Sequence, residues 1–120
     1  MYYPQEIEVW YILPSIRREL SKELVKHNLT QREISSKLNI TEAAVSQYLK
    51  EKRANLVKFD DMITKAIQKG AKKIVERDEN VMKEIQKIIN LMRKSKILCK
   101  IHHQYDKDLP ENCNHCIYEK

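Results

Sequence analysis

Cysteine and histidine side chains near the end of the chain are the residues best suited to bind a metal ion. Cys113 and Cys116 form a Cys-x-x-Cys pair, and Cys99 with His102 forms a Cys-x-x-His pair upstream. Two such pairs supply the four ligands that structural zinc takes in tetrahedral geometry. The predicted zinc ligands are therefore Cys99, His102, Cys113 and Cys116, with His103 and His115 as competitors for the histidine position.

The same residues leave two other interpretations open. Three cysteines and a histidine can also hold an iron–sulfur cluster, which would make the protein a redox sensor. Alternatively, the thiols stay unligated in an unstructured tail. An odd number of cysteines, three in total, argues against a disulfide framework in a cytoplasmic chain.

The sequence contains few of the motifs that enzymes use for catalysis. The 120 residues contain a single glycine, whereas phosphate loops, dinucleotide fingerprints and nucleophile elbows each need several glycines at fixed offsets. No nucleophile with a nearby base is evident, and a thiol oxidoreductase would need a strand pattern that is missing. The chain is not predicted to be an enzyme, and no small-molecule substrate is predicted.

Positive charge gathers in the middle of the chain. The formal net charge is +6. Residues 31–58 carry six basic against three acidic side chains, and residues 59–98 carry ten against six. A basic centre of this kind favours a polyanionic partner.

A pair of short helices is predicted within this basic centre. Thr30 and Glu33 have the spacing of a capping box, which begins a helix, and Thr41 is a good cap for a second helix. Asn39 between them suits a sharp turn. Apolar residues lock such a pair, and the candidates are Ile34, Leu38, Ile40 and Val45. Two short helices joined by a tight turn make a helix-turn-helix, whose second helix enters the DNA major groove.

The segment "TQREISSKLNITEAAVSQYL" resembles the phage-repressor-like (XRE-type) helix-turn-helix class. Thr30 and Gln31 match the Thr/Ser–Gln pair that begins the first helix of that class. Ser35 stands where the class usually has alanine, and Asn39 where it usually has glycine. Both departures are compatible with the fold, because one is small and the other tolerates a turn.

Over its whole length the chain resembles short archaeal regulators that have this domain first and a cysteine-rich tail last. The matching pieces are "LPSIRREL", "AAVSQYLKEKR" and "LCKIHH…LPENCNHC". Such regulators often carry a further Cys-x-x-Cys pair just before the tail. The corresponding stretch here, near "IINLM", has none, which argues against a larger metal cluster.

The resemblance implies a set of DNA-contacting residues. Gln31 and Arg32 would contact phosphates, where free N–H groups at a helix start also favour anions. Base contacts would come from Thr41, Glu42, Ala43, Ser46 and Gln47, and further backbone contacts from Lys50, Lys52 and Arg53. Gln47 is the strongest candidate for base recognition, since its amide can pair with adenine through two hydrogen bonds.

Helical periodicity predicts the elements around this pair. Residues 5–13 are expected to form a short helix that ends before Pro14, with Trp10 and Leu13 facing inward. A second helix follows, with Ile16, Leu20 and Leu24 on one face, and Asn28 is a suitable stop.

A long apolar seam lies between Phe59 and Lys94. It consists of Ile67, Ala71, Ile74, Val81, Ile85, Ile88 and Met92. The seam predicts either one long helix or two helices divided near Asp78, with Asp78 as a plausible cap for the second. It has two compatible interpretations, an intramolecular core and a dimerisation surface.

The sequence as a whole predicts an all-α protein in three regions. Residues 1–58 form a helix-turn-helix DNA-binding domain, residues 59–98 a long helical connector and dimerisation region, and residues 99–120 a loop-like metal-binding tail. The predicted function is a sequence-specific transcriptional regulator that binds double-stranded DNA as a homodimer. The alternatives are a metal- or redox-responsive sensor-regulator and a protein-interaction adaptor for an acidic partner.

A cytoplasmic location is expected. No apolar run approaches the length that spans a bilayer, and the start "MYYPQEIEVWYIL" lacks the basic residues of a signal peptide.

Overall fold

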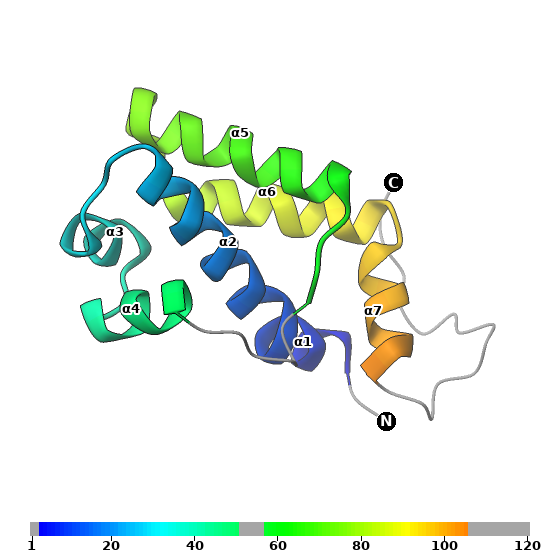
Figure 1. Ribbon diagram of the computed structural model, residues 1–120. Coiled ribbons are helices and arrows are strands. Elements are labelled where there is room, and N and C mark those ends of the chain that lie inside the picture. The colour runs from blue at the N-terminus through cyan, green and yellow to red at the C-terminus, as the bar shows by residue number, and fades with distance from the viewer. Residues whose placement is uncertain (1–2, 51–56, 106–120) are drawn as a thin grey trace.

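Helices make up almost all of the chain that the structure describes. The computed structural model describes residues 3–50 and 57–105. The elements are α1 (Pro4–Ile7), a π-helical turn η1 (Glu8–Ile12), α2 (Leu13–Lys26), α3 (Gln31–Leu38), α4 (Glu42–Lys50), α5 (Asp61–Arg77), α6 (Val81–Lys94) and α7 (Ile97–Tyr105). Because α1, η1 and α2 are continuous, these elements form six helical segments, and the described ranges contain no strand (Figure 1). The predicted all-α class is confirmed.

Pro14 lies inside the first helical run and does not end it. The expectation of a break before this residue is wrong. Proline lacks an N–H, and in a regular α-helix its ring clashes with the carbonyl four residues earlier. Here the preceding turn is π-helical, and the Leu13 N–H donates to the Glu8 carbonyl five residues back. We attribute the uninterrupted helix to this wider turn, which relieves the clash.

The π-helical turn also changes which side chains face the core. Ile7 and Ile12 are fully buried, whereas Trp10 is 49% exposed. The prediction that Trp10 faces inward is therefore wrong. A regular 3.6-residue period does not include the extra residue of a π turn, so the predicted face is displaced.

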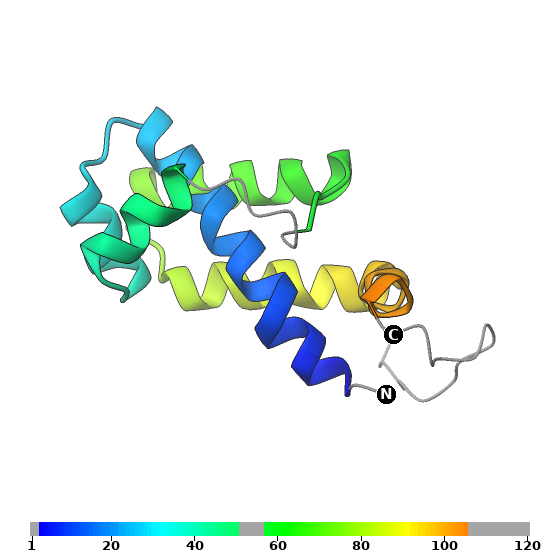
Figure 2. The ribbon, with the colours of Figure 1, turned by 60° about the horizontal axis from the view of Figure 1, so that its bottom comes forward.

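α2 lies at the centre of the arrangement. Its buried stripe contains Ile16, Leu20 and Leu24, each with no exposed surface, as the periodicity predicted. The helix packs against α3 and α4 on one side and α5 on another (Figures 1 and 2). Asn28, just after the helix, adopts the left-handed conformation with φ of 68°, and its predicted role as a stop is confirmed.

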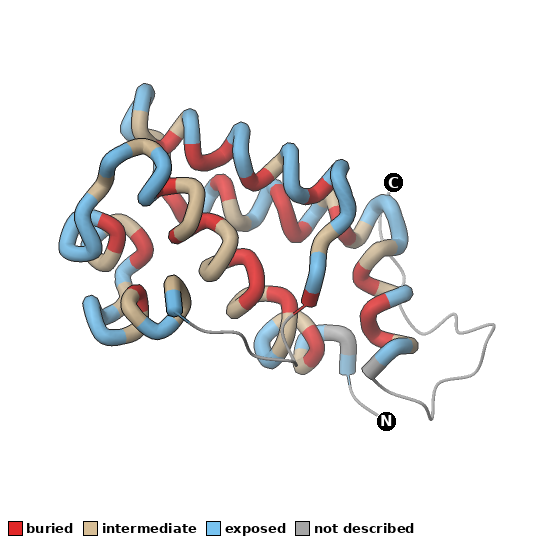
Figure 3. Tube along the Cα trace, in the orientation of Figure 1, coloured by how far each residue is buried: buried red, intermediate tan, exposed pale blue. Residues whose placement is uncertain are grey.

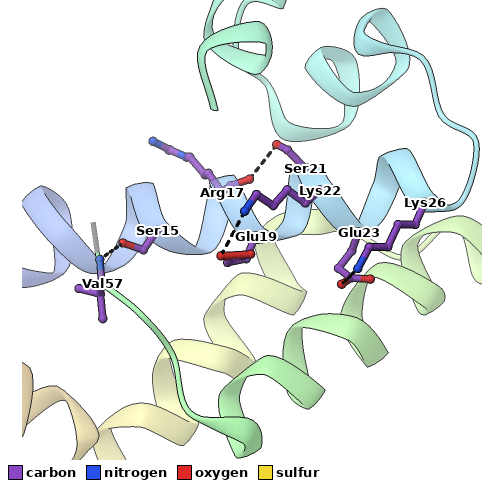
Figure 4. Close-up of polar contacts among 8 residues, drawn as sticks. All are labelled: Ser15, Arg17, Glu19, Ser21, Lys22, Glu23, Lys26 and Val57. Carbon is purple, nitrogen blue, oxygen red and sulfur yellow. Dashed lines mark hydrogen bonds and ion pairs between the residues drawn. The ribbon is translucent and has the colours of Figure 1, made fainter. Parts of the chain in front are cut away.

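Ser15 connects α2 to the chain that leads into α5. Its hydroxyl donates to the Tyr11 carbonyl at 2.6 Å. It also accepts from the Val57 N–H at 2.9 Å (Figure 4). The second bond is buried and joins residues that are distant in sequence. A buried backbone N–H left without a partner costs about 1–3 kcal/mol, so Ser15 helps to fix where the chain approaches α5.

α5 and α6 form the helix pair that was one of the two predicted possibilities. Asp78 ends α5 in the left-handed conformation with φ of 51°, and Asn80 caps α6 by accepting from the Lys83 N–H. The prediction that Asp78 caps the second helix is wrong. Most of the apolar seam is buried within the chain, namely Ile67, Ala71, Ile74, Val81, Ile88 and Met92. The intramolecular interpretation of the seam is confirmed.

The predicted loop-like tail begins with a helix. Residues 99–105 belong to α7, which packs against α1 and α6. Leu98 and Ile101 are buried one turn apart and join the core cluster, and Figure 3 shows buried positions along α7. The prediction of a loop is therefore wrong for this part of the tail, because neighbouring helices supply the apolar surface that the tail lacks alone. No helix in the described ranges is long and apolar enough to cross a membrane.

Gly70 lies on the side of α5 that packs against α6. A Cβ placed on it would meet the Cβ and Oε1 of Glu84 at 3.7 Å and the Cδ1 of Ile88 at 3.9 Å. Glu84 is only 3% exposed, and its carboxylate lies 3.1 Å from the Lys87 ammonium and 3.9 Å from that of Lys73. The site has room for one methyl group at ordinary contact distances.

Gly70→Ala is therefore expected to stabilise the fold by about 0.5–1 kcal/mol, because alanine lowers the entropy cost of a helical position. Gly70→Leu is expected to destabilise it by about 1–3 kcal/mol through overpacking against Glu84 and Ile88. Urea unfolding followed by circular dichroism measures both. A loss of stability in the alanine variant would contradict the described spacing of the two helices.

Candidate nucleic-acid interface

The first turn of α3 contains the predicted capping box. The Thr30 hydroxyl accepts from the Glu33 N–H at 3.1 Å, and the Glu33 carboxylate accepts from the Thr30 N–H at 3.0 Å. The backbone hydrogen bond from Thr30, followed by its side-chain hydrogen bond, lowers the pKa of Glu33 below its usual value. These two bonds leave the N–H groups of Gln31 and Arg32 as the open donors at the start of the helix.

The connection between α3 and α4 is a tight turn through Asn39. This residue adopts the left-handed conformation with φ of 54°, and the next N–H, of Ile40, donates to the Ser35 carbonyl. The Thr41 hydroxyl then accepts from the Ala44 N–H at 3.0 Å. The predicted roles of Asn39 as the turn residue and Thr41 as the cap are confirmed.

Apolar side chains fix the two short helices to each other and to α2. Ile34 and Val45 are fully buried, and Leu38 is 8% exposed. Ile40 and Leu49 are partly buried against the same core. The pair therefore has one apolar side facing α2, and its remaining surface faces outward.

The predicted contact residues lie on that outward surface. Those that are exposed are Gln31, Arg32, Thr41, Glu42, Ala43, Gln47 and Lys50, while Ser46 is half-buried. Figure 3 shows the outer sides of α3 and α4 as largely exposed. Lys52 and Arg53 lie outside the described residues. The described members of the predicted set are thus exposed or half-buried on the α3–α4 pair.

Basic side chains of α3 and α4 have few acidic partners in the described ranges. Arg32 and Lys50 make no ion pair with any other residue in the described ranges. Lys37 pairs with Asp78 at 3.1 Å, close to the end of α5. The Glu33 carboxylate is already bound in the capping box. Arg32 and Lys50 are both exposed.

The predicted metal ligands are only partly described. Cys113 and Cys116 lie outside the described residues, and the described ranges contain no group of three or more metal-binding side chains. Cys99 and His102 lie on α7, where His102 is 3% exposed. The Nδ1 of His103, also on α7, lies 3.7 Å from the Sγ of Cys99.

The Cys99–His103 spacing fits one tetrahedral zinc ion. With Zn–S near 2.3 Å and Zn–N near 2.05 Å, two ligands at the tetrahedral angle lie about 3.6 Å apart. The His103 Nδ1 also lies 2.9 Å from the Cys99 carbonyl. Metal binding through Nδ1 would replace this contact, whereas binding through Nε2 would keep it as an orienting hydrogen bond. His103 was a competing candidate by spacing, and helical placement at i and i+4 favours it.

The two candidate sites lie far apart in the fold. In Figures 1 and 2, α3 and α4 lie at one end of the molecule and α7 at the other.

No protein-family model, curated protein or solved structure matches the chain.

The lowered pKa of Glu33 makes the capping box pH-dependent. The carboxylate's contribution should be present above the usual glutamate pKa of 4.5 and should be lost as the pH falls through the lower folded value. Glu33→Ala should therefore be less stable than the natural chain at neutral pH, and the difference should shrink as the pH falls below 4.5. Denaturant unfolding at a series of pH values measures it.

Glu33→Gln is the matched control, because its amide keeps the acceptor without titrating. Its stability relative to Glu33→Ala should stay constant over the same pH range. A constant difference between the natural chain and Glu33→Ala would contradict the assigned cause.

Proposed function

We propose that the chain is a sequence-specific transcriptional regulator that binds double-stranded DNA, with α3 and α4 acting as a helix-turn-helix. The observation that carries this proposal is the orientation of α4. Its polar residues from Thr41 to Lys50 are mostly exposed while Val45 is fully buried. A helix held in this way presents its first turns to a partner without disturbing the core.

The dimensions and chemistry of α4 suit the major groove. B-DNA has a major groove about 12 Å wide, which admits one α-helix. Gln47 is exposed on α4 and offers both a donor and an acceptor, as adenine recognition requires. Gln31 and Arg32 would position the pair on phosphates, together with Lys50 and the undescribed Lys52 and Arg53.

Binding as a homodimer is also proposed, because one short helix contacts too few base pairs for high specificity. The fold limits which residues can form contacts between two copies of the chain. The core uses most of the seam from Ile67 to Met92 within one chain, with Ile85 only partly buried, so a dimer would rest mainly on other surfaces.

Replacing Gln47 tests the base-reading role. Gln47→Ala should weaken binding to a preferred sequence, selected from a random DNA pool, by roughly 1–3 kcal/mol. Binding to unrelated duplex should change little, because phosphate contacts supply that affinity. Gln68→Ala, at an exposed position on α5, is the matched control and should leave both unchanged. Equal losses on all DNA would contradict base recognition by Gln47.

Salt dependence separates DNA binding from the adaptor alternative. A DNA-binding chain should show a steep fall of log affinity with log salt and keep its preference for the selected sequence. An adaptor for an acidic protein should show no sequence preference on DNA. Fluorescence anisotropy at several salt concentrations measures both properties.

A second candidate function is metal-responsive regulation, and the Cys99–His103 spacing is the observation that favours it. We propose that Cys99 and one of the two adjacent histidines, with Cys113 and Cys116, hold zinc. The alternative cofactor is an iron–sulfur cluster. Bound zinc would supply a crosslink between α7 and the last residues of the chain, since metal binding can provide folding energy.

Cys99 is common to both histidine assignments, so its replacement tests the site directly. Cys99→Ser should lower the metal content of the purified chain, and Lys100→Ala, exposed on the same helix, should not. Elemental analysis measures the metal, and an absorption spectrum distinguishes colourless zinc protein from a brown iron–sulfur protein. Unchanged metal content in Cys99→Ser would remove this residue from the ligand set.

A further inference from the structure

A groove of about 580 Å³ lies between α2, the end of α3 and the start of α6. Its apolar wall includes Leu13, Leu38, Ile85 and Ile89. Two further wall residues are well exposed, Val9 at 60% and Met82 at 72%. The volume lies within the range of about 300–1,000 Å³ that is usual for small-molecule sites. None of the predicted DNA-contacting residues lines it.

The charged groups of the groove differ between its two ends. At one end the Glu8 carboxylate is bound by two hydrogen bonds from Arg93, at 2.7 and 2.8 Å. It therefore offers little free negative charge. Lys37 lines the groove where α6 begins, beside Asp78. Arg17 also lines it and makes no ion pair within the described ranges.

These groups lie at a suitable spacing for an elongated ligand. Arg17 follows Glu8 by nine residues along a continuous helical run, which corresponds to roughly 13 Å at 1.5 Å per residue. An apolar surface thus extends from Val9 and Ile89 towards the cationic group of Arg17, whereas the charge of Lys37 is paired with Asp78. A molecule with an apolar chain and one anionic group matches both parts.

We propose that this groove binds an amphipathic carboxylate. The apolar chain would lie along Leu13, Met82 and Ile85, and the carboxylate would accept hydrogen bonds from the Arg17 guanidinium. Arginine presents a planar pair of donors that fits both oxygens of a carboxylate. Contact of the chain with these apolar side chains removes apolar surface from water, which favours binding.

The position of the groove gives the ligand a route to regulation, and this part rests on the proposed DNA-binding function. Leu38 and Asn39 line the groove and form the turn that leads into α4. A ligand that favours one placement of this turn would change DNA affinity, and DNA would change ligand affinity by the same factor.

Decanoate is a suitable probe, with decanol as the matched uncharged compound. The full chain should bind decanoate saturably at one site, measured by calorimetry and by the fluorescence of Trp10, the chain's single tryptophan. Arg17→Gln should weaken decanoate binding about tenfold, the cost of one charge-assisted hydrogen bond, and leave decanol binding unchanged. Circular dichroism confirms that the chain stays folded.

Two exposed methionines provide a second test. Met82→Glu should weaken both probes, because it places a charge in the groove wall. Met62→Glu, at an exposed position on α5 outside the groove, should leave both unchanged. Absence of saturable binding, or equal effects of the two methionine variants, would overturn the proposal.

Sedimentation of the ligand-free chain tests the competing occupant, a second copy of the chain. A dimer that Met82→Glu dissociates would overturn the small-molecule proposal. The binding measurements contain no DNA, so a chain that binds decanoate but no DNA would refute the proposed function and leave the groove assignment intact.

Discussion

Burial of one stripe on α2 is the constraint on which the rest of this structure depends. Ile16, Leu20 and Leu24 have no exposed surface, and they contribute to one core shared by the other helices. Full burial of such a side chain contributes about 1.5–3 kcal/mol. The stripe fixes α3 and α4 on one side and α5 on another, so the candidate interface and the C-terminal helices share a single support.

The candidate interface depends strongly on this support because its helices are short. α3 has eight residues and α4 has nine, and isolated helices of this length are marginal in water. The capping box at Thr30 and Glu33 helps α3 to begin, but Ile34 and Val45 hold the pair against α2. Packing of the core therefore does not require the outward side chains of α3 and α4.

Local interactions explain what the sequence predicted well. The capping box, the turn at Asn39 and the cap at Thr41 each join residues within about five positions. Such contacts follow from residue type and spacing alone. The exposure of Gln47 also follows from the helical period once Val45 is placed inward. The confirmed elements of the candidate site are of this local kind.

By itself, the sequence determined the buried face of α2, the helices α3 and α4 with their caps at Thr30 and Thr41, and the polar side of α4, because side chains a few residues apart set these features. Only the tertiary structure decided that the helix continues through Pro14, that Asp78 ends one helix instead of beginning the next, and that α7 packs beside the first helix. It also brought Arg17 and Met82 to one groove. The packing of α7 and the groove depend on contacts between segments distant in the chain, which no local spacing encodes. The helix through Pro14 and the end of α5 at Asp78 depend on backbone geometry, a π-helical turn and a left-handed residue, that residue type and spacing leave open.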